Sequence, residues 1–226
     1  MDVAKAFTFV PEDEQWVGKI GIGALITLLS FLIIPIPLLV GYMVGVARNV
    51  MNGVPQPLPV WEDWGQLFKD GLAIIVALLV YTLPFWLLAC FAGVATVGFG
   101  GMAEANEDAA AAGMMATFGL AGCLMFLFWL ALFFLSPAIF VQYIRAGELG
   151  ATFRFGEVAA IARDNIGHIL VVFLVTLGVN FVLGLILGVI SIIPCIGWII
   201  SFIVSMAAGP YLAVATGHMY GQIAVS

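Results

Sequence analysis

Charged residues are scarce in this chain, and that scarcity decides its class. Only 9% of the 226 residues are Asp, Glu, Lys or Arg, while 64% are hydrophobic. A soluble domain of this length covers its surface with polar groups, and roughly a quarter of its residues are charged. The composition therefore excludes an ordinary soluble domain, and a lipid bilayer is the solvent that suits it.

Basic residues and cysteines are also few. The chain has seven Lys and Arg residues and no basic patch, so we expect no nucleic-acid partner. The first fourteen positions hold four acidic residues and one basic residue, whereas a cleavable signal peptide needs a basic stretch before a short apolar core, so none is expected. The three cysteines, Cys90, Cys123 and Cys195, are odd in number and widely spaced. This pattern indicates small apolar residues rather than a disulfide framework or a zinc site.

Long apolar runs fill most of the chain. A helix needs about 20 mostly apolar residues to cross the hydrocarbon core of a bilayer. Five runs approach or exceed this length: residues 19–47, 72–98, 114–144, 166–193 and 196–220. Backbone polar groups in lipid must bond within their own segment, so each run should be helical. The sequence predicts an all-α, polytopic transmembrane helical bundle that forms a single membrane domain over residues 1–226.

The first run is ambiguous because Pro35 and Pro37 interrupt it. Proline removes a backbone donor and kinks or ends a helix. The run is either one kinked span or a short re-entrant hairpin, and the hairpin would give six helices. We favour the hairpin, which places the N-terminus on the same side as the C-terminus.

Two long connections mix aromatic, apolar and charged residues. Residues 49–70 and 146–165 are amphipathic and long enough to lie in the plane of the membrane surface. Five of their rings are predicted to be interfacial anchors at the headgroup level: Trp61, Trp64, Phe68, Phe153 and Phe155. The alternative is that these rings pack on neighbouring loops.

The distribution of basic residues predicts the orientation of the chain. Arg48, Lys69, Arg145, Arg154 and Arg163 flank the two amphipathic connections, while residues 99–113 carry only acidic charges. Positive residues concentrate on the cytoplasmic side of membrane proteins. We therefore expect a multi-pass protein of the cytoplasmic membrane. Residues 49–70, residues 146–165 and the C-terminus should be cytoplasmic, and residues 99–113 external.

A weak internal repeat is also visible. Residues 7–51, 58–145 and 152–224 each begin with an aromatic, acidic, basic and glycine pattern and continue into an apolar block. Each block later meets a proline, at Pro37, Pro137 and Pro210. This pattern favours three related units, each an in-plane segment followed by a helical hairpin.

Residues 41–50 and 58–71 carry the most distinctive motifs of the chain. A helix end bearing Tyr42 and Arg48 precedes Pro59-Val60-Trp61-Glu62-Asp63-Trp64, and Phe68-Lys69-Asp70-Gly71 follows. Over about residues 20–85 the chain resembles the bacterial and archaeal membrane family known as domain of unknown function 4013. Arg48 is alone in a helix end where that family has more basic residues. The resemblance implies a polytopic membrane protein and supplies no activity, substrate or catalytic residue.

Ionisable residues are missing from the middle of the runs, which argues against a proton-coupled transporter or pump. Asn180 is the most polar residue within a run, and it could bond across helices or line a substrate path. Gly184 and Gly188 lie on the same face of that helix and are our best prediction for close helix packing. The same small-residue spacing occurs at Gly41/Gly45 and Gly217/Gly221, as chance alone would allow.

His168 and His218 are the candidates for cofactor binding, because a buried imidazole can ligate haem, chlorophyll or a metal. With no acidic cluster nearby, an interfacial hydrogen bond is the simpler interpretation. The sequence lacks hydrolase, metalloprotease, nucleotide and dinucleotide motifs, so we predict neither an enzyme nor a bound cofactor.

Three functions remain open. The first is a non-enzymatic scaffold or accessory subunit that contacts lipid and other membrane subunits or itself. The second is a transporter or channel for a small or lipid-like solute. The third is a haem- or pigment-binding membrane subunit.

Overall fold

A computed structural model describes residues 1–103 and 106–225 of the chain, and every regular element in this part is helical. The fold is therefore all-α, as the sequence predicts. In chain order the helices are α1 (Val3–Glu12), α2 (Trp16–Leu29), α3 (Ile36–Met51), α4 (Trp64–Gly101), α5 (Glu107–Ala146), α6 (Phe155–Asp164), α7 (Ile166–Ile190) and α8 (Ile196–Val225). Two 3₁₀ turns, η1 (Ser30–Leu32) and η2 (Leu149–Phe153), lie between them.

Four helices are long and apolar enough to cross a bilayer: α4, α5, α7 and α8. They coincide with the last four apolar runs. Helix α4 has 38 residues and helix α5 has 40, so each is about 60 Å long and exceeds the hydrocarbon core of a bilayer. These two helices must therefore extend beyond the lipid or tilt within it.

The first apolar run is broken into two short helices. Helix α2 ends at Leu29, and Ile33 takes a positive φ of 66° in the turn before α3. Pro35 and Pro37 lie at the beginning of α3, where a missing backbone donor costs nothing. Helices α1 and α2 are bent by 104° and count as a fifth candidate span only if they are taken together. The prolines thus separate two helices rather than kink one long span.

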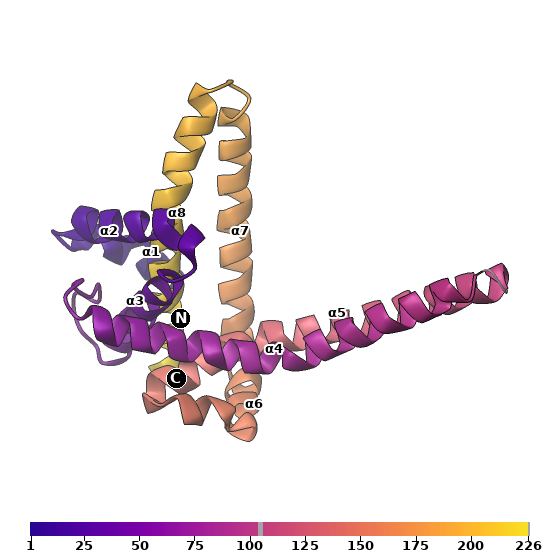
Figure 1. Cartoon of the computed structure of the whole chain (residues 1–226). Coiled ribbons are helices and arrows are strands. Elements are labelled where there is room, and N and C mark those ends of the chain that lie inside the picture. Colours follow the sequence, from indigo (N-terminus) through magenta and orange to yellow (C-terminus); the bar gives the residue numbers. More distant parts are fainter. Residues whose placement is uncertain (104–105, 226) are drawn as a thin grey trace.

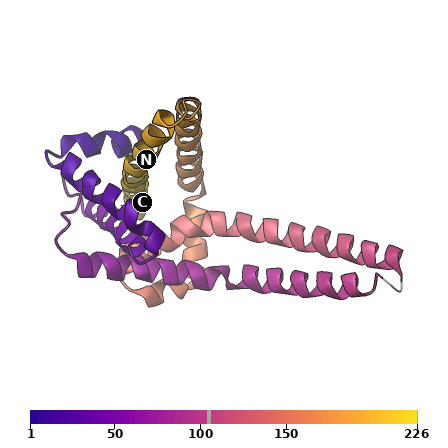
Figure 2. The ribbon, with the colours of Figure 1, turned by 45° about the horizontal axis from the view of Figure 1, so that its top comes forward.

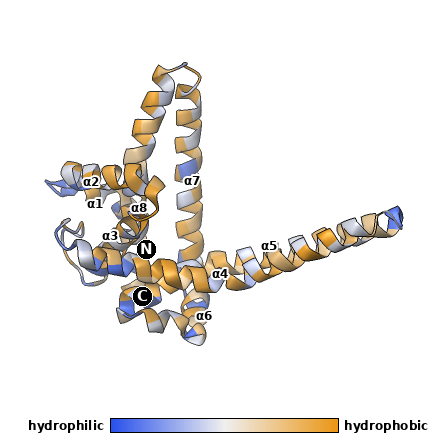
Figure 3. Ribbon diagram, viewed as in Figure 1, coloured by the Kyte–Doolittle hydropathy of each residue, from blue (hydrophilic) through white to orange (hydrophobic). Residues whose placement is uncertain are grey.

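Two helical hairpins leave a common base in different directions, as Figures 1 and 2 show from two angles. We call residues 84–103 and 106–136 of the α4–α5 hairpin the first arm and residues 176–209 of the α7–α8 hairpin the second arm. The rest of the chain is the base. Both arms are apolar along their length (Figure 3), whereas the base gathers the ends of most helices and both chain termini.

Burial is concentrated in the base. Every residue from Pro137 to Ile144 in α5 is buried, and in α8 the buried residues other than Gly197 lie from Pro210 onward. The main core cluster combines side chains of α3, α4, α5, α6, α7 and α8. The arms instead expose large apolar side chains such as Val97 and Leu185, which is the pattern of a surface that meets lipid.

Helices α3 and α4 cross at backbone contact distance. A Cβ atom on Gly41 would collide with the carbonyl of Leu67, and one on Gly71 with the carbonyl of Pro37. Gly217 and Gly221 of α8 approach α3 in the same way, near the carbonyls of Met43 and Ala47. The small residues therefore let α3 lie between α4 and α8 in the centre of the base.

Candidate functional site: the polar cluster of the base

Asp70 is the most deeply buried acidic residue of the base. It lies in the second turn of α4, is 2% exposed, and accepts three hydrogen bonds. The donors are Arg48 Nη1 of α3 at 2.9 Å, Gln66 Nε2 of α4 at 2.9 Å and the Tyr143 hydroxyl of α5 at 2.7 Å. Because a buried carboxylate is stable only when it is paired and bonded, this cluster fixes three helices relative to one another.

A second polar cluster joins the N-terminal segment to the loop before α4. Lys19 Nζ contacts Asp13 at 2.6 Å and donates to the Leu58 carbonyl at 3.0 Å. Burial raises the pKa of Asp13, but hydrogen bonds from Lys19 and the Gln15 amide, together with the Lys19 charge, outweigh that effect. The net result is an Asp13 pKa below the usual value, which favours the charged carboxylate.

Trp61 and Tyr42 extend this second cluster. Their rings stack with centroids 4.1 Å apart and planes 7° apart. Trp61 Nε1 donates to the Lys19 carbonyl at 2.9 Å, and the Tyr42 hydroxyl donates to the Pro59 carbonyl at 2.9 Å. The loop at residues 52–63 is therefore held against α2 and α3 by bonds to its backbone and by ring packing.

The N- and C-terminal helices are tied together by a third group. Gln222 Oε1 of α8 accepts from the Asp2 backbone amide at 2.6 Å, and Gln222 Nε2 lies 3.0 Å from His218 Nδ1. Phe9 of α1 stacks on the His218 ring with centroids 4.6 Å apart. The segment at the N-terminus thus covers the face of α8 that carries His218.

Further polar contacts hold α5 and α6 in the base. Gln142 Nε2 donates to Glu157 Oε2 of α6 at 2.6 Å. Arg145 donates to the last carbonyls of α8, those of Ala224 at 2.9 Å and Ile223 at 3.2 Å. A cation at a helix C-terminus complements the helix dipole. Together these contacts make the base a rigid, bonded unit.

The predicted cofactor residues have ordinary surroundings. His218 is 6% exposed and in contact with Gln222 and Phe9. His168 is half-buried and lines an open pocket of about 330 Å³ that Asp2 and Gln222 also line. Within the described part of the chain, no three His, Cys, Asp or Glu residues form a metal-binding group. His168 and His218 stay candidates for cofactor binding, and the expectation that no cofactor is bound stays untested.

Asn180, Gly184 and Gly188 face outward from the second arm. Asn180 is exposed, and its amide nitrogen donates to the Thr176 carbonyl of the same helix at 2.8 Å. A Cβ on Gly184 or Gly188 would meet no atom within 4 Å. The close packing predicted for these glycines is not made inside the chain, so it stays a prediction about contact with another molecule.

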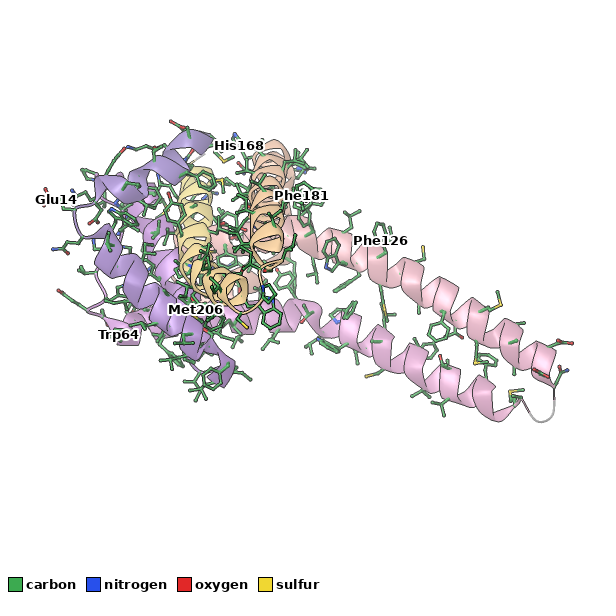
Figure 4. All side chains as sticks on the ribbon, turned by 90° about the horizontal axis from the view of Figure 1, so that it is seen from above. Glu14, Trp64, Phe126, His168, Phe181 and Met206 are labelled. Carbon is green, nitrogen blue, oxygen red and sulfur yellow. The ribbon has the colours of Figure 1, made fainter. Side chains whose placement is uncertain are left out.

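The predicted anchor rings have different positions. Trp61 is 8% exposed and packs inside the protein, which was the alternative for these rings. Trp64, Phe68 and Phe155 are exposed, and Figure 4 shows Trp64 at the edge of the base. Phe153 is half-buried and stacks on Tyr81 with centroids 6.5 Å apart. The exposed rings remain available to a membrane surface.

Sequence reasoning did not predict that Arg48 and Asp70 pair. The sequence places Arg48 and Asp70 only as charged residues at the edges of apolar runs. Glu104, in the acidic loop, lies outside the described residues. A signal was present, since Tyr42, Arg48, Trp61 and Asp70 all belong to the motifs that carry the family resemblance. The structure shows that these motif residues meet where α3, α4 and the intervening loop pack together.

The comparisons with known proteins agree with that motif. The model of a protein family of unknown function, DUF4013, matches residues 24–192, which is more than half of the chain. The chain belongs to the DUF4013 family. No curated protein and no solved structure matches it significantly. Within this DUF4013 protein, the matched range contains α4 and α5 of the first arm, α7 of the second arm and the entire Asp70 cluster.

Proposed function

We propose that this DUF4013 protein is a non-enzymatic membrane scaffold that acts as an accessory subunit. The base carries two apolar arms, and the arms pack against transmembrane helices of another subunit. The polar groups of the base support this role because they are engaged in bonds that join helices. A buried ion pair whose oxygens are all occupied is suited to holding a structure rather than to chemistry.

The observation that carries the proposal is the outer face of α7. Asn180, Gly184 and Gly188 are exposed there, and no helix in the described part of the chain packs against the two glycines. In lipid, small residues let a partner helix approach closely, and an amide side chain bonds across helices. An arm built only to sit in lipid would have no need of either feature.

Affinity purification from a mild detergent tests this proposal. We expect a membrane protein partner to be recovered with the chain in stoichiometric amount. Replacing both glycines, Gly184→Leu and Gly188→Leu, should reduce that recovery several-fold because the added side chains keep the partner helix away. The matched control, Val182→Leu with Leu185→Ile, should leave it unchanged. Recovery of the chain as a lone monomer in several mild detergents would contradict the proposal.

A lipid-like solute carrier is a second candidate, supported by a groove on the first arm. The groove has a volume of about 270 Å³, and its lining is almost entirely apolar, with Phe91 and Phe99 of α4 facing Leu120 and Leu124 of α5. Mass spectrometry of lipids that remain with the purified chain separates the two functions. Enrichment of one lipid class, lost in a Leu120→Trp variant, would favour the carrier over the scaffold.

A further inference from the structure

Three prolines mark the boundary between the base and the arms. Pro84 follows the last buried residue of α4 in the base, Tyr81. Pro137 begins the buried stretch of α5, and Pro210 begins the main buried part of α8. Each of the three arm helices that contain a proline therefore changes from buried to exposed within about one turn of it.

Each proline weakens its helix at this level. Proline lacks the backbone donor that would bond to the carbonyl four residues earlier, and its ring pushes that carbonyl away. In α5 the Ser136 hydroxyl donates to the Phe133 carbonyl at 3.3 Å, in place of the donor that Pro137 lacks. Sharp bends in helices concentrate at such positions. The boundary is thus the level at which the arms bend most easily.

A few aromatic rings join the first arm to the part of α7 in the base from which the second arm leaves. Phe133 of α5 and Phe173 of α7 form an edge-to-face pair with centroids 4.2 Å apart, and Trp129 and Phe134 pack on Phe133. Beyond these rings the arms diverge (Figures 1 and 2). Phe126 on the first arm is 63% exposed and Phe181 on the second arm is 66% exposed (Figure 4).

A planar bilayer restricts how this open shape can be accommodated. The hydrocarbon core is about 30 Å thick, and both apolar arms must lie within it. Two arms that leave one base in different directions cannot both stand along the membrane normal. The first arm ends in Glu107 and Asp108 and therefore has to reach water on the far side. The second arm can lie across the membrane only if it turns towards the first.

We propose that the two arms swing about Pro84, Pro137 and Pro210, between the open form seen here and a closed form in which they lie side by side. The closed form brings the facing apolar sides of the arms together, and the rings of Phe133 and Phe173 act as the pivot. The swing rests on the proposed scaffold function, because it decides whether the arm faces are available to a partner helix. Domain closure about a few hinge residues is a common switching motion, and prolines inside helices are positions at which helices bend.

The native cysteines provide a direct test. Cys90 and Cys123 lie in the first arm and Cys195 lies at the tip of the second, and all three are exposed free thiols. A Cys90→Ala chain carries spin labels on Cys123 and Cys195, one on each arm. Double electron–electron resonance then measures the distance between the arms of the purified chain, in detergent and in lipid nanodiscs.

We expect two distance populations in detergent, and in nanodiscs a several-fold shift towards the shorter distance. The Pro84→Ala, Pro137→Ala, Pro210→Ala chain should give one narrow distribution, because the missing backbone bonds are restored. Pro11→Ala changes a helical proline in α1, away from the arms, and should behave as the unaltered chain. A size-exclusion profile and a circular dichroism spectrum check that each variant is folded.

One narrow distance that is the same in detergent, in nanodiscs and in the triple proline variant would overturn the swing. Because this measurement uses the isolated chain, its result is independent of partner recovery. Two populations without any co-purified partner would contradict the scaffold function alone. A stoichiometric partner with a single fixed distance would contradict the swing alone.

Discussion

At the residue scale, Asp70 makes the clearest prediction. Replacing it by asparagine keeps the shape of the side chain but removes the negative charge to which Arg48 and Tyr143 both donate hydrogen bonds. Breaking a buried charged pair costs several kcal/mol, and the partial exposure of Arg48 lowers this to about 2 kcal/mol. We therefore expect Asp70→Asn to lower the melting temperature in detergent by roughly 5 °C.

The matched control is Asp164→Asn. Asp164 also faces an arginine, Arg163, at 3.1 Å, but both side chains of that pair are largely exposed. Surface ion pairs contribute little to stability, so the control should melt as the unaltered chain does. Equal melting temperatures for all three chains would show that the Asp70 cluster does not hold the base together.

The sequence identifies the important residues, but it does not predict roles that depend on contacts between distant parts of the chain. The motif containing Tyr42, Arg48, Trp61 and Asp70 could be read directly from the sequence. Its meaning could not, because Arg48 and Asp70 are 22 positions apart and pair only when α3 crosses α4. Trp61 likewise resembles a headgroup anchor until its stacking on Tyr42 is known.

At the scale of elements, the crossing of α3 and α4 depends on two glycines. The Cβ atom introduced by Gly71→Ala would collide with the Pro37 backbone carbonyl, which cannot move aside as a flexible side chain can. Overpacking of a core costs about 1–3 kcal/mol, and a backbone collision should reach the upper end. We expect Gly71→Ala to lower both the melting temperature and the yield of monodisperse protein.

Gly93 in the same helix provides the control, because a Cβ there would meet no atom within 4 Å. Alanine is a better helix former than glycine by about 1 kcal/mol, so Gly93→Ala should leave stability unchanged or raise it. A Gly71→Ala chain as stable as Gly93→Ala would mean that α3 and α4 are farther apart than the structure shows.

The sequence predicted the four long apolar helices better than it predicted the break in the first apolar run. Hydropathy located α4, α5, α7 and α8 because lipid requires long uninterrupted apolar runs. At residues 19–47, Pro35 and Pro37 fit both a kinked span and a re-entrant hairpin, so the prolines alone could not establish the favoured hairpin. The choice depends on the packing of α3 between α4 and α8 through glycines, which is a tertiary effect.

At the scale of the whole molecule, the polar base and apolar arms together predict an orientation in the membrane. Arg154 and Arg163 of the base are exposed, and no basic residue lies on either arm. Positive groups gather on the cytoplasmic side, so we expect the base to face the cytoplasm and the tip of the first arm to face outward. The three related units suggested by the sequence stay a prediction. In this orientation, their in-plane segments would all lie on one side of the membrane.

Accessible-cysteine labelling in intact cells measures that orientation. In a chain whose native cysteines are replaced by alanine, Asp108→Cys places a thiol at the tip of the first arm and Arg163→Cys places one on the base. A membrane-impermeant maleimide should label the first in intact cells and the second only after permeabilisation. Both sites are exposed in the structure, so accessibility reports the compartment rather than burial. Labelling of both from outside would mean that the first arm does not cross the bilayer, and the long apolar α4–α5 hairpin would then have to lie within one leaflet.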